Sequence, residues 1–204
     1  MSVTIKKHPD LERASSRRKQ VLDAAETCFS QRGFHGASMA EISKAAGMSA
    51  GHIYNYFDGK DAIIAAFVQQ NVDRGELLLG DLELHANPLQ SILDDVEKGV
   101  HDKMLPGIWK LPLEIFAEAA RNPTIAALVQ AAELRARGRL RVVLTKGRAL
   151  RGLTTDAAGL DGRIDALFSM FQGLHMRRLH NPSLNQAAMV AAFRLALTPL
   201  LFGE

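Results

Sequence analysis

The chain has 204 residues, 47% of them hydrophobic, which is long enough for one large domain or two small ones with their own cores. Residues 1–60 hold nine Lys or Arg against six Asp or Glu, and residues 61–204 hold sixteen of each, so the net charge of +3 lies on the N-terminal part. A single cysteine excludes an intramolecular disulfide framework, and the absence of a long apolar run or an uncharged leader favours a soluble, cytoplasmic protein.

Apolar residues recur at helical spacing over residues 16–32 and predict the first helix, which Gly33 should end. Cys28 lies on this apolar stripe, so we expect a small core residue rather than a reactive thiol. The N-terminal segment carries the basic residues Lys6, Lys7, Arg13, Arg17 and Arg18. They predict a basic N-terminal tail, which either follows DNA phosphates or is simply solvated.

The stretch over residues 36–63 predicts two short helices joined by a glycine turn. Ser38 and Glu41 have the spacing of a capping box, in which each side chain accepts the backbone N–H of the other residue. Gly47 falls where a left-handed residue would end that helix. Its buried face is expected to consist of Ile42, Ala45 and Ala46.

Ser49 offers an N-cap to the second helix, and Ile53 and Phe57, four residues apart, give it an apolar edge. Two helices of about two turns each, joined by a short turn, have the proportions of a helix-turn-helix. The rest of the second helix carries small, polar and aromatic side chains that a core does not require. The expected DNA-binding residues are Ser38, Ser49, Ala50, Gly51, His52, Tyr54, Asn55, Tyr56 and Lys60.

These side chains suit a DNA groove for different reasons. The two small residues at the start of the second helix let its N-terminus approach a phosphate. His52, Tyr54 and Tyr56 can donate hydrogen bonds to phosphate oxygens. Asn55 carries the paired donor and acceptor that reads adenine, and Lys60 adds a positive charge at the same edge.

A resemblance to the N-terminal DNA-binding domain of the TetR family of transcriptional regulators is carried by the run ISKAAGMSAGHIYNYFDGKDAI. The family pattern is roughly IA, AGVS, G, an apolar residue, Y, two residues, F and K. The similarity covers about residues 15–65 and departs from the pattern at Ser43, usually alanine, and at Tyr56, often histidine.

The resemblance implies an all-α protein with a helix-turn-helix domain and basic tail over residues 1–60, and an effector-binding and dimerisation domain over residues 61–204. It also implies the function: a dimeric regulator, most simply a repressor, that binds a palindromic operator and is released by a small-molecule effector. Dimerisation is also expected for a separate reason: helix-turn-helix proteins usually bind two DNA half-sites roughly 34 to 36 Å apart, one with each subunit.

Beyond residue 57 the pattern stays helical. Helices are expected over residues 58–84, 88–104, 112–122, 123–151, 160–179 and 185–201. The helix over residues 123–151 is rich in arginine in its second half. These arginines spread around the helix, which favours a solvated surface with ion pairs over a nucleic-acid stripe.

The middle helices carry the densest cluster of large apolar residues, and the resemblance implies a ligand cavity in this domain. The expected effector-binding residues are Phe67, Met104, Trp109, Leu113, Glu114, Phe116, Phe168, Phe171, Gln172 and His175. Among them Glu114, Gln172 and His175 would be the polar anchors. Alternatively, the same residues fill an ordinary core.

The resemblance further implies that the last two helices pair with their copies in a four-helix dimer interface. The expected interface residues are Ile164, Leu167, Phe171, Leu174, Phe193, Leu197 and Leu200. Both apolar faces could instead belong to the core of a single chain.

Two other functions remain open. One is a helical protein that binds small molecules without specific DNA binding. The other is an enzyme, since residues 47–51 match the G-x-S-x-G motif, but that motif needs a strand before the serine and none is predicted. The seven histidines show no spacing typical of metal ligands, and we expect no metal and no cofactor.

Overall fold

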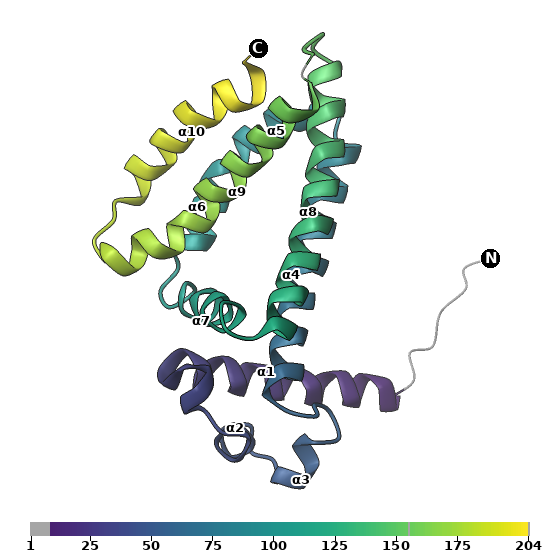
Figure 1. The fold of residues 1–204 in the computed structure, drawn as a ribbon, viewed down its shortest axis with the longest axis vertical. Helices are drawn as coiled ribbons and strands as arrows, with labels where there is room; N and C mark the ends of the chain where they lie inside the picture. Colours follow the sequence, from purple (N-terminus) through teal and green to yellow (C-terminus); the bar gives the residue numbers. More distant parts are fainter. Residues whose placement is uncertain (1–8, 155, 204) are drawn as a thin grey trace, which may run out of the picture. The chain divides into compact units, whose positions relative to one another are not determined.

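The computed structural model describes residues 9–154 and 156–203, with side chains from Glu12 onward. Of the predicted basic tail, Lys6 and Lys7 lie outside the described residues, whereas Arg13, Arg17 and Arg18 are exposed on the first helix. In this part of the chain there are helices and no strand (Figure 1). The helices are α1 (Pro9–Gly36), α2 (Met39–Ala45), α3 (Ala50–Ile53), α4 (Lys60–Leu84), α5 (Pro88–Asp94), α6 (Val96–Met104), α7 (Lys110–Ala119), α8 (Pro123–Ala149), α9 (Ala157–His180) and α10 (Gln186–Phe202). The expected all-α class, with a helix-turn-helix domain before a larger helical domain, is confirmed.

The described residues form two compact units, and the division falls within α4, after Phe67. The N-terminal unit comprises α1, α2, α3 and the start of α4, and the C-terminal unit comprises the rest. The predicted domain boundary at residue 60 coincides with the first residue of α4 and stays a prediction. None of the described helices is long and apolar enough to cross a membrane.

The N-terminal unit has a core built on the apolar stripe of α1. Val21, Ala25 and Phe29 are almost completely buried, and the Phe29 ring lies 6.4 Å from that of Phe67 in an edge-on contact. Cys28 is buried in the same stripe, and this burial raises the pKa of its thiol. The predicted first helix is confirmed, although it begins earlier, at Pro9, and Gly33 interrupts it with a φ of 72°.

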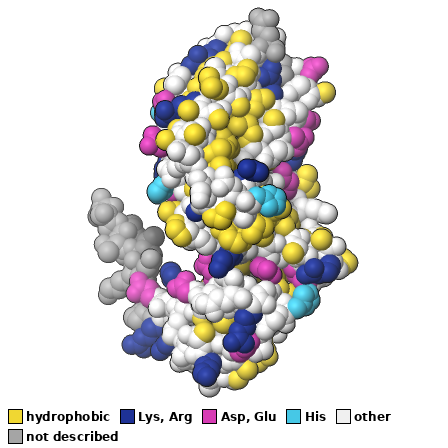
Figure 2. All heavy atoms as spheres, turned by 90° about the vertical axis from the view of Figure 1, so that its left-hand side faces the viewer, with side chains coloured by type: hydrophobic (Ala, Val, Ile, Leu, Met, Phe, Trp, Pro, Cys, Tyr) yellow, Lys and Arg dark blue, Asp and Glu magenta, His cyan; other side chains and the backbone are white. Residues whose placement is uncertain are grey.

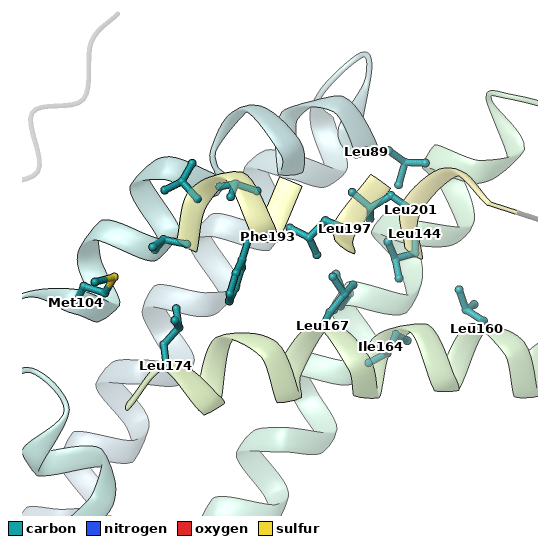
Figure 3. Close-up of a cluster of buried hydrophobic side chains, with 14 residues drawn as sticks. Leu89, Met104, Leu144, Leu160, Ile164, Leu167, Leu174, Phe193, Leu197 and Leu201 are labelled. Atoms are coloured by element: carbon teal, nitrogen blue, oxygen red, sulfur yellow. The ribbon is translucent and has the colours of Figure 1, made fainter. Parts of the chain in front are cut away.

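The C-terminal unit is organised around one cluster of buried side chains, contributed mainly by α6, α9 and α10 and closed by α5 and α8 (Figure 3). Side chains of α9 and α10 point toward one another across this core, among them Leu167 and Leu197. Helix α5 approaches α8 at Gly147, where an added Cβ would lie 2.6 Å from Leu89 Cγ. A glycine is therefore needed there for close packing rather than for backbone conformation.

Most of the expected helices of this unit are present with shifted ends. The helix expected over residues 88–104 is two helices, because the chain turns at Asp95 between α5 and α6. Helix α9 begins earlier than expected because the Asp156 side chain caps it, accepting the N–H of Gly159 over 2.6 Å. Asn185 caps α10 in the same way, through the N–H of Ala188 at 2.9 Å.

Candidate nucleic-acid interface and ligand cavity

The first helix of the helix-turn-helix starts at the predicted capping box, which is confirmed. Ser38 Oγ accepts the Glu41 N–H over 3.2 Å, and Glu41 Oε2 accepts the Ser38 N–H over 3.0 Å. Arg32 also pairs with the Glu41 carboxylate. The Ser38 N–H, followed by this guanidinium, holds the pKa of Glu41 below its ordinary value.

The turn between the two helices is a Schellman motif centred on Gly47, which has a φ of 63°. The Gly47 N–H donates to the Lys44 carbonyl over 3.1 Å, and the Met48 N–H donates to the Ser43 carbonyl over 2.9 Å. Ser43 is itself buried, and its hydroxyl donates to the Ala40 carbonyl. The unusual serine is thus satisfied within its own helix.

The buried face of α2 differs from the expected one at a single position. Ile42 and Ala46 are buried as expected, but Ala45 is exposed and Ser43 occupies the inner side instead. Positions 42, 43 and 46 are neighbours on a helix surface, so one polar residue within the apolar face misled the pattern.

The second helix begins at Ser49, whose Oγ accepts the His52 N–H over 3.2 Å, and it anchors its inner side with the buried Ile53 and Phe57. It is shorter than the two turns expected. Helix α3 ends at Ile53, and the Asn55 and Tyr56 N–H groups then donate three residues back, to His52 and Ile53. The recognition segment is therefore one α-turn followed by a tighter turn.

The outward side of this segment is exposed and polar. Tyr54 is 50% exposed, and Tyr56 Oη lies 3.4 Å from His52 Nε2 with the two rings edge to face. Asn55 is exposed, and among the described residues its side chain has no hydrogen-bond partner. A Cβ added at Gly51 would meet no atom within 4 Å. The Tyr54 and Asn55 side chains and the open surface at Gly51 are thus accessible to a groove. By contrast, His52 and Tyr56 contact each other.

Lys60 was expected to have its ammonium group available for a DNA phosphate, but most of that group is used within the protein. Its Nζ donates to the carbonyls of Phe34 and Ala37 over 2.7 and 2.9 Å, and it lies 4.6 Å from the centre of the Phe34 ring. The Phe34 carbonyl belongs to the last turn of α1 and the Ala37 carbonyl follows that helix directly, so the ammonium satisfies acceptors at its C-terminal end. Only one of its three N–H groups remains for a phosphate.

Replacing Lys60 by methionine should therefore lower the free energy of unfolding by about 2 kcal/mol, because two partly buried carbonyls lose a charged donor. Urea denaturation measures this loss. Lys44→Met is the matched control, since Lys44 is exposed and should change stability by less than about 0.5 kcal/mol. Equal stability of the two variants would contradict the structural role of Lys60.

Two residues of α1 support the helix-turn-helix: Arg18, which the sequence placed in the basic tail, and Gln20, for which it predicted no contact. An Arg18 guanidinium nitrogen donates to the Tyr56 carbonyl over 3.0 Å, and the guanidinium lies 4.2 Å from the centre of the Phe57 ring. Gln20 Nε2 donates to the Ala46 carbonyl over 2.6 Å. Arg18 lies one turn before Val21 on the same side of α1, but helical periodicity marks apolar side chains and carries no signal for polar contacts 38 and 26 residues away.

A cavity of about 210 Å³ lies within the C-terminal unit, between α4, α7 and α8. Its walls are mostly apolar and several are small, while its charged residues belong to α4 and α8. The lining residues are Val68, Asn71, Val72, Gly75, Glu76, Leu79, Pro112, Ile115, Phe116, Val129, Ala132, Glu133, Arg135, Ala136 and Arg139. An apolar cavity with a few polar groups is the usual form of a small-molecule site.

Of the residues expected to bind an effector, Phe116 is the one that lines this cavity. Met104 belongs to the buried core, and Phe168 and Phe171 pack against it. Phe67 packs in the N-terminal unit instead. His175 is buried, Gln172 is exposed, and three residues on or next to α7 are half-buried: Trp109, Leu113 and Glu114. Large apolar side chains mostly fill the core, whereas the cavity is bordered by smaller ones.

The residues expected at a dimer interface are mainly core residues of the single chain. Five are buried in it: Ile164, Leu167, Leu174, Phe193 and Leu197. Phe171 and Leu200 are half-buried against the same cluster. These five side chains face inward and leave little surface for a second copy, so an interface on α9 and α10 would use other residues of these helices.

Residues 21–67 match the sequence profile of the family described as bacterial regulatory proteins, tetR family. The HTH-type transcriptional regulator UidR of Escherichia coli strain K12 is 32% identical over 123 residues. That match covers 57% of this chain and 59% of UidR, so the chain spans somewhat more than half the length of this relative.

Solved structures share the whole fold. Salmonella enterica GusR has a TM-score of 0.73 at 21% identity, covering 97% of this chain and 99% of GusR. The transcriptional regulator FadR of Bacillus subtilis, in complex with stearoyl-CoA, has a TM-score of 0.71 at 20% identity, covering 91% of this chain and 98% of FadR. At these identities the likeness establishes the fold alone.

Proposed function

Because this chain belongs to the TetR family of bacterial regulatory proteins, we propose that it is a ligand-responsive, DNA-binding transcriptional regulator, most simply a repressor of the cytoplasm that binds a palindromic operator as a dimer. The observation that carries the proposal is the exposed recognition segment after Ser49. It presents the N–H groups of α3, the His52–Tyr56 pair and an unpartnered Asn55 on one polar surface.

On this surface the contacts divide into two kinds. Phosphates bind Ser38, Ser49, the N-terminus of α3 and the tyrosine hydroxyls, which sets the register of the domain on the duplex. Asn55 reads a base edge in the major groove. Lys60 contributes its remaining N–H only at the edge of this surface, since its other donors serve the carbonyls of the protein itself.

We place the dimer contact on the outward sides of α9 and α10. Figure 2 shows hydrophobic side chains spread over the face that carries α10. On α10, Leu195 is 78% exposed, and on α9, Met176 and Leu179 are 44% and 45% exposed. Several alanines of α10 are exposed as well and would permit close helix packing. An exposed apolar face of this kind supports pairing with a second copy.

The effector would bind in the cavity between α4, α7 and α8. FadR of Bacillus subtilis, which shares the fold, is seen in complex with stearoyl-CoA, so this architecture can hold a small molecule. An effector releases DNA only through its differential affinity for two conformers of the protein. Moving the balance from 1:99 to 99:1 requires roughly 5.5 kcal/mol of such difference.

Changing Asn55 to alanine should weaken binding to the specific operator roughly ten- to a hundredfold, because a bidentate base contact contributes about 1–3 kcal/mol of discrimination. Binding to unrelated DNA should stay the same, and so should the slope of log K against log salt. Fluorescence anisotropy with DNA from upstream of the protein's own gene measures both. Gln31→Ala, an exposed residue of α1 outside the proposed contact set, is the control.

The alternative function, small-molecule binding without specific DNA recognition, gives a different result. Wild type and Asn55→Ala would then bind specific and unrelated DNA equally weakly. Equal loss of affinity for both kinds of DNA would instead make Asn55 a phosphate contact and contradict its role in sequence choice.

A further inference from the structure

The cavity of the C-terminal unit contains two carboxylates whose charge is not neutralised by an ion pair. Glu133 of α8 and Glu76 of α4 both line it. Across the described residues, no cationic side chain forms a salt bridge with either, and neither carboxylate accepts a hydrogen bond. Carboxylates beside an apolar wall are costly unless a partner compensates for the lost water.

The neighbouring guanidinium groups are mostly committed elsewhere. Arg139, which also lines the cavity, pairs with Glu83 at 3.0 Å. Arg137, one turn from Glu133, pairs with Asp161 and Asp165 of α9. Arg135 is the remaining cation of the lining; it is exposed and makes no ion pair with a described residue.

The environment of Glu133 disfavours the negative charge of its carboxylate. Partial burial raises the pKa of this carboxyl, Arg137 opposes the shift, and Asp165 adds to it. A cation placed beside Glu133 would stabilise the ionised form of this carboxyl, and the attraction between the two charges would favour binding of the cation.

The opening next to the cavity is also acidic. A shallow depression lined by Asp73, Glu76, Leu77 and Arg139 shares two of its residues with the cavity. Since Arg139 is paired with Glu83, the two carboxylates of α4 dominate the charge there. An approaching cation meets a favourable potential before it reaches the apolar walls.

We infer that the effector class of this cavity is an amphipathic cation, an apolar body that carries one protonated amine or quaternary ammonium group. The apolar body lies against Val72, Ile115 and Val129, and the charged group lies at Glu133. Phe116 also lines the cavity, and an aromatic ring in the wall of a site favours a cationic ligand. This inference rests on the proposed role of the cavity as the effector site.

Gly75 provides a way to close the cavity without disturbing the packing around it. It lies in α4 on the cavity wall, and a Cβ added there would meet no atom within 4 Å. Leucine at this position should fill the space and also favour the helix, since glycine is the weaker helix former. Gly138 of α8 is the matched control, because it is equally open but does not line the cavity.

The test uses probes that share one apolar tail, namely n-hexylamine, which is protonated at neutral pH, 1-hexanol and hexanoate. Isothermal titration calorimetry of the full chain should show hexylamine binding at least tenfold more tightly than the other two. Glu133→Gln should remove this preference and leave hexanol binding unchanged. Gly75→Leu should abolish binding of every probe, whereas Gly138→Leu should bind like wild type. A thermal melt of each variant establishes that it is folded.

Every other outcome overturns the inference. Tighter binding of hexanoate would assign the charged contact to Arg135 instead, and equal binding of the three probes would make the site merely apolar. Hexylamine binding that survives in Gly75→Leu would lie outside the cavity. If no probe bound, the inference that the cavity takes an amphipathic cation would also be wrong. DNA binding by the same preparations, measured without probes, decides the DNA-binding part of the proposed function independently.

Discussion

Replacing Arg148 by methionine should lower the free energy of unfolding by about 3 kcal/mol, because three backbone carbonyls lose a buried, charged donor, although that of Gly203 keeps a hydrogen bond from Arg163. Arg148 is 2% exposed and donates to the carbonyls of Leu201 and Gly203 at 3.0 Å and of Thr154 at 3.1 Å. These bonds tie the end of α10 to the C-terminal part of α8.

The buried charge of Arg148 has no carboxylate partner among the described residues. Burial, followed by the positive charge of the nearby Arg163, lowers the pKa of its guanidinium, but an arginine side chain stays charged in proteins at neutral pH. The last carbonyls of α10 stabilise it instead, since the C-terminal end of a helix is its negative pole.

Urea denaturation of the variant measures the loss. Arg135→Met is the control on the same helix; it removes an exposed guanidinium and should change stability by less than about 0.5 kcal/mol. Similar midpoints for the two variants would show that the carbonyl contacts of Arg148 contribute little.

Acidification from pH 6.5 to pH 4 should remove about 3 kcal/mol of stability through His175 alone. This side chain is 4% exposed, and its Nδ1 has no hydrogen-bond partner among the described residues. Burial, followed by the positive charge of Lys103, lowers the pKa of His175 from 6.5 to about 4.

The sign follows from which state binds the proton. The unfolded chain takes up a proton near pH 6.5, whereas the folded chain resists it until about pH 4. The contribution is therefore complete above pH 6.5 and is lost as the pH falls to about 4, below which both states are protonated.

His175→Phe should flatten this part of the pH profile, and because Nδ1 makes no bond to a described residue, the variant should still fold at neutral pH. The measurement is urea denaturation of both proteins at several pH values between 7 and 4. The difference between the two stabilities should narrow or reverse on acidification by about 3 kcal/mol. If the free energies of unfolding of the two proteins changed in parallel with pH, the pKa of His175 would not be lowered in the folded protein.

Local signals predicted the helix-turn-helix well because its geometry is set by neighbours in sequence. The Ser38–Glu41 capping box, the left-handed Gly47 and the Ser49 cap each depend on residues within a few positions. Lys60 was placed less well. Its partners lie 26 and 23 residues earlier, and a lysine at the start of a helix gives no sign of them.

The cavity could not be located from the sequence because the prediction favoured large apolar residues. Met104 and its neighbours fill the core, whereas the cavity borders Gly75, Ala132 and Ala136. A glycine in mid-helix and two alanines four residues apart were the available signal. Small residues on facing helices leave space, but only the packing of those helices shows where that space lies.

The sequence also could not show which side of α10 is available for a dimer contact. This helix is apolar around most of its circumference, so periodicity does not distinguish its inner side from its outer side. Phe193 and Leu197 face the core, and Leu195 remains exposed. The side that carries the largest residues is the one that the chain itself buries.

DNase footprinting of the purified protein on DNA from immediately upstream of its own gene, at two salt concentrations, tests the proposed operator binding most directly. Protection of a palindrome whose half-sites are centred one helical turn apart, roughly 34 to 36 Å, is the expected result. The protection should weaken at the higher salt without changing position, because each neutralised phosphate steepens log K against log salt by about 0.9. Weak protection without a preferred sequence that disappears with salt would contradict specific operator recognition by this protein.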